Sequence, residues 1–132
     1  MSEVQQQLRG ANNVTIVWRL RVGEPSFVEV DITFGIVEIN WDYVIRFNSD
    51  VASNGTFFSD DNGLVIMQRS TNSSDSVQSN YFPQTEVASV ASDSAALSIV
   101  TSQSHGVSSR APGSLEFMVF RRLLNPGIPS KG

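Results

Sequence analysis

The sequence predicts an all-β protein with the fold of an antiparallel β-sandwich. Three observations indicate this class: apolar residues recur with a period of two, turn-forming residues separate the short apolar runs, and no long stretch keeps the spacing of an amphipathic helix. The chain has 132 residues and a mass of 14.4 kDa, which suits one domain with a sizeable core. We therefore expect residues 1–132 to form a single β-sandwich domain.

The first two predicted strands alternate apolar and polar residues, as a strand with one buried face does. Residues 14–22 read VTIVWRLRV and residues 27–36 read FVEVDITFGI, and in both runs every second residue is apolar. The intervening GEPS is a turn-forming cluster, so the two strands should form an antiparallel hairpin. Trp18 falls on the apolar side of the first strand, and we expect it in the core.

The later strands are short apolar runs between turns. They are predicted at residues 43–49, 56–59, 64–69, 85–90, 95–101 and 113–124. The sequences NG at residues 54–55 and DDNG at residues 60–63 are strong turn signals, because Asn and Gly tolerate a positive φ. The serine-rich stretches 70–80 and 102–113 are expected to be solvated loops. The proline- and glycine-containing tail, residues 125–132, should be frayed or extended.

Composition excludes several classes of partner. Thirteen acidic residues outnumber nine basic ones, the net charge is −4, and the basic residues are scattered, so nucleic acid is not an expected partner. No run reaches the roughly 20 apolar residues of a membrane span, and the N-terminus lacks the layout of a signal peptide. Glycosylation sequons at Asn13, Asn54 and Asn72 slightly favour a lysosome, vacuole or other secretory compartment over the cytosol.

Two adjacent arginines interrupt the last apolar strand. Side chains alternate along a strand, so Arg121 and Arg122 should lie on opposite faces, each among apolar groups. A guanidinium stays charged, and burying it without a partner costs several kcal/mol. At least one of them should therefore meet a carboxylate, backbone carbonyls or water, and the internal carboxylate could be that of Glu116, Asp50 or Asp61.

No complete catalytic constellation is recognisable. The only histidine, His105, is close to Ser108 and Ser109, but the stretch lacks the G-x-S-x-G pattern of a nucleophile elbow. One histidine and no cysteine also leave metal sites without their usual ligands. The pair Asp60 and Asp61 is expected to serve the turn rather than acid–base catalysis. We assign no catalytic and no metal-binding residue.

Aromatic side chains are the other candidates for a sugar site, because sugars stack on their faces. Besides Trp18, the chain contains Trp41, Tyr43 and Tyr81. Trp41 and Tyr81 lie in less periodic sequence, so we expect these two to be exposed.

Several blocks of the sequence resemble one known family. The blocks are NGTFFSDDNGLVIMQR, SNYFP, LSIVTSQSHGVSS and GSLEFMVFRRLL. Their order and spacing are similar to those of the C-terminal β-domain of glycoside hydrolase family 38 α-mannosidases, where an NYYP element, a QGGSS loop and a strand of the form GSLELM-x-x-RRLL stand. The resemblance covers about residues 43–124. The loop before the last strand departs from that pattern at five positions: Ser102, Gln103, His105, Val107 and Pro112.

The resemblance implies a role within a larger enzyme. Family members are retaining exo-mannosidases whose zinc ion and nucleophilic aspartate belong to an N-terminal α/β domain, and that domain is absent from this sequence. The chain alone should therefore hold no cofactor and hydrolyse no mannoside. Its expected partner is the catalytic domain, in the same polypeptide or a companion chain, with mannosides as substrates of the complete enzyme. Self-association is a further possibility.

The resemblance also gives the paired arginines a role. An arginine of the C-terminal half approaches the active site in the family, and Arg121 and Arg122 match its paired arginines. Together with His105 and Tyr81, they are our candidates for the substrate side or the domain interface. The alternative is a stand-alone carbohydrate-binding or protein-interaction module with the same sandwich fold.

Overall fold

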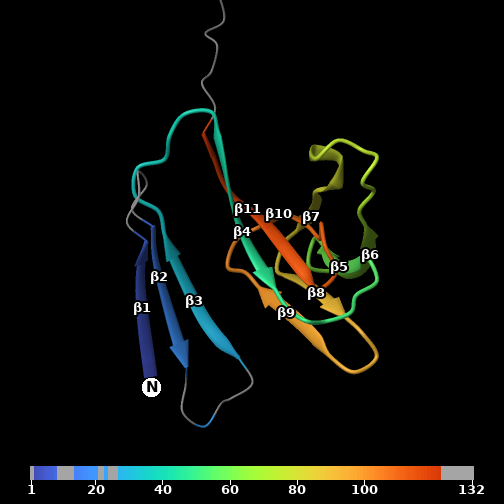
Figure 1. Ribbon diagram of the computed structural model, residues 1–132, viewed down its shortest axis with the longest axis horizontal. Coiled ribbons are helices and arrows are strands. Elements are labelled where there is room, and N and C mark those ends of the chain that lie inside the picture. The colour runs from blue at the N-terminus through green and yellow to red at the C-terminus, as the bar shows by residue number, and fades with distance from the viewer. Residues whose placement is uncertain (1, 9–13, 21–22, 24–26, 123–132) are drawn as a thin grey trace, which may run out of the picture. The chain divides into compact units, whose positions relative to one another are not determined.

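The computed structural model describes residues 2–8, 14–20, 23 and 27–122. These residues fall into two compact units. The first consists of the described part of Met1–Trp41 together with Arg122, and the second is Asp42–Arg121. Both units are built from strands (Figure 1). The single-domain organisation stays a prediction.

The first unit contains a three-stranded antiparallel sheet in the order β1-β2-β3. Its strands are β1 (Ser2–Leu8), β2 (Val14–Leu20) and β3 (Val28–Thr33). Leu20 pairs with Val28 and Thr15 with Thr33, which confirms the predicted hairpin. Strand β1 was not predicted, and Trp18 is half-buried rather than fully buried. Residues 21–22 of the predicted strand and most of the predicted turn lie outside the described residues.

The second unit is built from two four-stranded sheets. One has the order β4-β11-β10-β7 and consists of Trp41–Asn48, Ser114–Arg122, His105–Ser108 and Phe82–Gln84. The other has the order β6-β5-β8-β9 and consists of Val65–Ser70, Thr56–Asp61, Val87–Ala91 and Ala96–Val100. The end residues Trp41 and Arg122 of two strands belong to the first unit.

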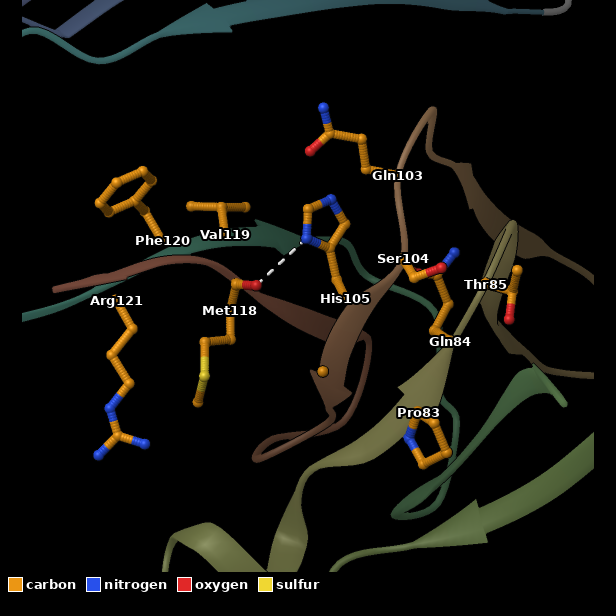
Figure 2. A pocket seen from close by; sticks show the side chains of 11 residues that line it. Pro83, Gln84, Thr85, Gln103, Ser104, His105, Met118, Val119, Phe120 and Arg121 are labelled. Carbon is orange, nitrogen blue, oxygen red and sulfur yellow. Dashed lines mark hydrogen bonds between the residues drawn. The ribbon is translucent and has the colours of Figure 1, made fainter. Parts of the chain in front are cut away.

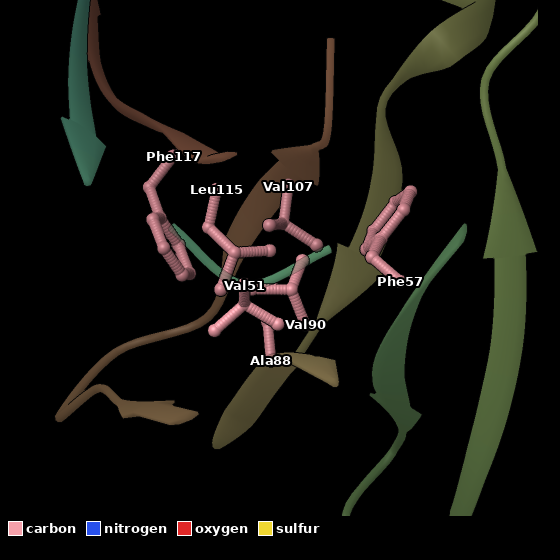
Figure 3. Packing of buried hydrophobic residues seen from close by; sticks show 7 residues of the cluster. All are labelled: Val51, Phe57, Ala88, Val90, Val107, Leu115 and Phe117. Atoms are coloured by element: carbon pink, nitrogen blue, oxygen red, sulfur yellow. The ribbon is translucent and has the colours of Figure 1, made fainter. Parts of the chain in front are cut away.

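The hydrophobic core of the second unit receives side chains from both four-stranded sheets. Figure 3 shows this cluster of buried residues: Val51, Phe57, Ala88, Val90, Val107, Leu115 and Phe117. Phe117 on β11 and Val107 on β10 are paired across one sheet, and Phe57 and Val90 belong to the other. The prediction of an antiparallel β-sandwich is therefore confirmed.

The two Asn-Gly turns have the geometry that their sequence predicts. Asn54 and Gly55 have φ angles of 50° and 76°, and Asn62 and Gly63 have 58° and 70°. Two successive positive φ angles match the twist of the strands that such a turn joins. The second turn connects β5 to β6, with Asp61 paired to Val65. The predicted turns are confirmed.

Two predicted loops contain more structure than expected. Within residues 102–113, β10 pairs with both β7 and β11, and Val107 and Ser108 are buried. Within residues 70–80, a short 3₁₀ helix, η1 (Gln78–Asn80), ends at a buried amide. Asn80 accepts a hydrogen bond from the backbone of Asn72 at 2.7 Å and donates one back at 2.9 Å, which closes the loop on itself.

Some predictions concern residues that the structure does not describe. They are the sequon at Asn13, the residues 123–124 of the arginine strand and the tail 125–132. Among the described residues, no helix has the length and apolar character needed to cross a membrane.

Candidate functional site

A pocket of about 360 Å³ lies in the second unit where β7, β10 and β11 run side by side. Residues 83–85, 103–106 and 118–121 line it (Figure 2). The strand pairing explains this assembly, because His105 lies opposite Gln84 on one side, and its neighbour Gly106 lies opposite Met118 on the other. The pocket therefore brings together two of the four predicted site residues, His105 and Arg121.

His105 is held by the sandwich and not by a catalytic partner. Its Nδ1 lies 3.2 Å from the backbone oxygen of Met118 (Figure 2). Its ring packs edge-on against Phe117, with the ring centroids 6.3 Å apart. Ser108 is three residues further along β10, so it lies on the opposite face of the strand. His105 and Ser108 therefore do not form the nucleophile–base pair of a hydrolytic triad.

Arg121 has its charge partner within the second unit. Its Nε lies 2.8 Å from Oδ1 of Asp42, and both side chains are about half exposed, at 47% and 44%. Figure 2 shows the Arg121 side chain extending away from His105 on the other side of the strand. The sequence suggested Glu116, Asp50 or Asp61 as the internal partner, and this was wrong because strand pairing aligns the start of β4 with the end of β11.

Arg122 serves the backbone of the first unit. Its Nη1 donates to the carbonyl of Val37 at 3.0 Å, while its own carbonyl accepts from the N–H of Asn40 at 2.6 Å. Val37 is buried, so this bond gives its carbonyl a charged donor. Arg122 does not line the pocket, whereas Arg121 does. The two adjacent arginines therefore have different surroundings.

Tyr81 is tied to a buried carboxylate. Its hydroxyl donates to Oε1 of Glu116, and Arg46 donates from Nε and Nη2 to Oε2. Burial first, and then the bond to Glu116, raise the pKa of the Tyr81 phenol well above its usual value. The prediction that Tyr81 is an exposed platform was wrong, since the ring is half-buried, whereas Trp41 is 60% exposed as predicted.

Glu116 remains ionised despite its position in the sheet. Burial on its own would raise the pKa of this carboxyl. The hydrogen bonds from Tyr81 and Arg46 and the charges of Arg46 and Arg110 together outweigh burial, so its pKa lies below the usual range.

Gln84 contributes a buried acceptor beside the pocket. Its side chain is 1% exposed, and its Nε2 donates to Oγ1 of Thr101 at 2.8 Å. Its Oε1 has no hydrogen-bond partner among the described residues. Gln84, Asp42 and Arg46 were not predicted as site residues, because a polar residue in a short strand has no sequence feature that shows which way its side chain points.

The acidic pair at the DDNG turn is structural, as predicted. Asp60 is buried, and its Oδ1 accepts three backbone N–H groups at 2.9–3.0 Å while its Oδ2 accepts that of Gly63 at 2.9 Å. Burial would raise the pKa of this carboxyl, but the four backbone donors outweigh it and hold the pKa below its usual value. Asp61 is exposed, so the two carboxyls have separate environments.

The described residues also do not fit the zinc ion that the resemblance implies for the complete enzyme. Nowhere in this part of the chain do three or more His, Cys, Asp or Glu side chains come together as metal ligands would. His105 is engaged with the core and Asp60 with the backbone.

Comparison with known proteins identifies the family of this chain. Residues 1–128 match the model of the glycosyl hydrolases family 38 C-terminal domain. The epididymis-specific alpha-mannosidase of Sus scrofa is 35% identical over 100 residues, which are 74% of this chain and 10% of that protein. The lysosomal alpha-mannosidase of Cavia porcellus is 32% identical over 120 residues, 82% of this chain and 12% of that protein.

A third relative is also an alpha-mannosidase. The alpha-mannosidase 2x of Mus musculus is 35% identical over 86 residues, which are 65% of this chain and 8% of that protein. The chain thus spans about a tenth of the length of the curated relatives that it matches. From the family match and the all-β fold together, we conclude that this chain belongs to the C-terminal domain family of the glycoside hydrolase family 38 α-mannosidases.

Proposed function

We propose that the chain serves as a non-catalytic β-sandwich domain of a larger, zinc-dependent, retaining α-mannosidase. The observation that carries this proposal is the match to the C-terminal domain over residues 1–128, in a chain about a tenth as long as its relatives. Asp60 agrees with it, because both oxygens of its buried carboxylate accept backbone N–H groups, and among the described residues His105 has no hydrogen bond to an acid or a nucleophile. The catalytic groups then come from the remainder of the polypeptide or a companion chain.

Exposed apolar residues support contact with a partner domain. Leu64 at the turn is 84% exposed, and the next three residues, at the start of the edge strand β6, are all exposed: Val65, Ile66 and Met67. Four consecutive exposed apolar side chains, at a turn and at the start of the edge strand that follows it, favour burial against another protein surface. We propose that the catalytic part of the enzyme covers this edge.

We further propose that Arg121, and not Arg122, contributes to the mannose site. Arg121 is half exposed, and its partner Asp42 is also half exposed. A surface ion pair of this kind contributes about 0–1 kcal/mol, so its guanidinium can turn to a sugar hydroxyl at little cost. Arg122 is bound to the carbonyl of Val37, which gives it a structural role.

The test is steady-state kinetics in the complete enzyme that contains this chain. Arg121→Ala should lower kcat/KM for an aryl α-mannoside roughly 10- to 100-fold, the loss of one charge-assisted hydrogen bond. Arg110→Ala is the matched control, because Arg110 is exposed, does not line this pocket and is not on β6. An Arg121→Ala enzyme with the kcat/KM of the Arg110→Ala control would contradict the role of Arg121.

The isolated 132-residue chain gives a second test. With zinc and an aryl α-mannoside, we expect no hydrolysis above the rate of buffer alone. Turnover at the rate of a complete mannosidase would contradict the proposal that this domain is not catalytic.

A stand-alone carbohydrate-binding module is the second candidate, and one observation favours it. The pocket combines the exposed ring of Phe120 with the buried Oε1 of Gln84, which has no hydrogen-bond partner in the described part of the chain, and sugar sites join such polar and aromatic groups. Titration of the labelled chain with mannose, followed by NMR, separates the candidates. Saturable shifts of the Gln84 side-chain amide would favour the binding module.

A further inference from the structure

A second pocket, of about 380 Å³, lies in the same unit as the first. It is lined by Arg46 and Asn48 of β4, by Arg110 and Ala111 of the loop after β10, and by Ser114 at the start of β11. Its residues are different from those of the pocket beside His105. This pocket plays no part in the function proposed above.

The pocket has a surplus of positive charge. Both Arg46 and Arg110 line it, and there is no carboxylate among its lining residues. Glu116, which is ionised, neutralises Arg46 through two hydrogen bonds to one carboxylate oxygen. Within the described part of the chain, Arg110 forms no hydrogen bond and no ion pair. Arg110 is exposed and acts on Glu116 through its charge alone, so the two guanidinium groups carry one positive charge more than this single carboxylate.

The polar groups of the pocket are mostly unused donors. Ser114 is only 2% exposed, and its hydroxyl makes no hydrogen bond with any described residue. The side chain of Asn48 is likewise not hydrogen-bonded to the described residues. Guanidinium groups, an amide NH₂ and a hydroxyl all donate, so the matching ligand is one that accepts.

We propose that this pocket binds an oxyanion, a carboxylate or a tetrahedral sulfate or phosphate group. An oxyanion balances the charge of Arg110 and accepts from the fork of its N–H groups, which suits carboxylate and phosphate geometry. Ser114 donates its hydroxyl to the same ligand, because this hydroxyl has no hydrogen-bond partner among the described residues. Arg46, fixed by Glu116, holds one wall of the site in place.

NMR of the ¹⁵N-labelled 132-residue chain tests the proposal. Sodium acetate and sodium sulfate are titrated separately at constant ionic strength, with sodium chloride as the balancing salt. The Nε–Hε signal of Arg110 should shift and saturate with at least one of them. Tighter binding of acetate would identify a carboxylate site, and tighter binding of sulfate would identify a site for sulfate or phosphate.

Three variants make the test specific. Arg110→Gln should weaken binding roughly tenfold or more, because it removes a charge-assisted donor. Ser114→Ala, which removes only the hydroxyl, should weaken it by roughly threefold to tenfold. Arg69→Gln removes the same charge from a residue outside this pocket and should leave the affinity unchanged. The amide spectrum of each variant shows whether it is folded.

Two results would overturn the proposal. One is a shift that grows linearly with concentration for both anions, which indicates screening and not a site. The other is an equal affinity in folded Arg110→Gln and in the unchanged chain.

Discussion

Arg46 and Glu116 form an ion pair in which the carboxylate is shielded from solvent while the guanidinium is half exposed. The side chains of Glu116 and Arg46 are 3% and 50% exposed, respectively. Since Phe117 points into the core, its neighbour Glu116 lies on the other face of the sheet. Tyr81 completes the arrangement by donating to the second carboxylate oxygen. A charge placed there is stable only because every oxygen has a donor.

The first prediction concerns the hydrogen bond from Tyr81 to Glu116. Tyr81→Phe should raise the pKa of Glu116, because the hydrogen bond that helps to lower it is removed. The free energy of unfolding should fall by about 1–3 kcal/mol, since a buried carboxylate oxygen loses its donor. Carboxyl ¹³C shifts measured against pH report the pKa, and urea unfolding reports the stability.

Tyr43→Phe is the control for Tyr81→Phe. It makes the same chemical change on β4, and Tyr43 is not among the groups that shift the pKa of Glu116. The account is contradicted if the pKa of Glu116 is the same in the Tyr81→Phe protein as in this control.

Asp60 gives a second prediction, about stability. Asp60→Asn should lower the free energy of unfolding by about 2–4 kcal/mol, because one of the two oxygens becomes an NH₂ group that cannot accept from the backbone. Asp61→Asn, at the exposed neighbour, should change it by less than about 0.5 kcal/mol. Equal losses in the two variants, measured by urea unfolding, would show that the backbone bonds of Asp60 do not stabilise the fold.

The lowered pKa of Asp60 gives a third prediction, on pH. A carboxylate whose pKa is lower in the folded state stabilises the fold above the unfolded pKa of about 3.9, and this contribution is lost as the pH falls through the folded pKa. The stability difference between the unchanged chain and Asp60→Asn should therefore be constant above about pH 5 and shrink below about pH 4. A difference that stays constant to the lowest pH at which the chain folds would be inconsistent with this linkage.

Gly113 gives a fourth prediction. Its φ is +71°, and a Cβ there would lie 2.4 Å from the carbonyl oxygen of Ser49 and 2.7 Å from that of Val51. Gly113→Ala should cost about 3–5 kcal/mol, the sum of backbone strain and the clash. Gly55→Ala is the matched control, because Gly55 has φ +76° with no atom within 4 Å, and it should cost about 1–2 kcal/mol. Thermal unfolding measures the stability of both variants. Equal losses of stability in Gly113→Ala and Gly55→Ala would show that the added Cβ at residue 113 does not clash.

The sequence was sufficient for the parts of the fold that depend on local pattern. The alternation in residues 14–20 and the positive φ angles at the Asn-Gly pairs were predicted because both follow from neighbouring residues. Strand β1 was missed because SEVQQQL contains almost no apolar residue. Strand β10 was missed because four residues in a serine-rich stretch show no period.

The candidate site was predicted only in part, for a different reason. His105 and Arg121 were recognised as candidates, but their contacts depend on which strands pair, and distant pairings have no local signal in one sequence. The same holds for the partners of Glu116, which come from β4 and from the segment before β7.

The mass of the native polypeptide that contains residues 111–121 tests whether this chain is part of a larger α-mannosidase. Antibodies to the peptide APGSLEFMVFR would detect it in fractions of its source cells that are assayed for α-mannosidase activity. The account predicts a band several times larger than 14.4 kDa that co-fractionates with this activity. A band near 14.4 kDa, separated from the activity, would contradict a role within a larger mannosidase.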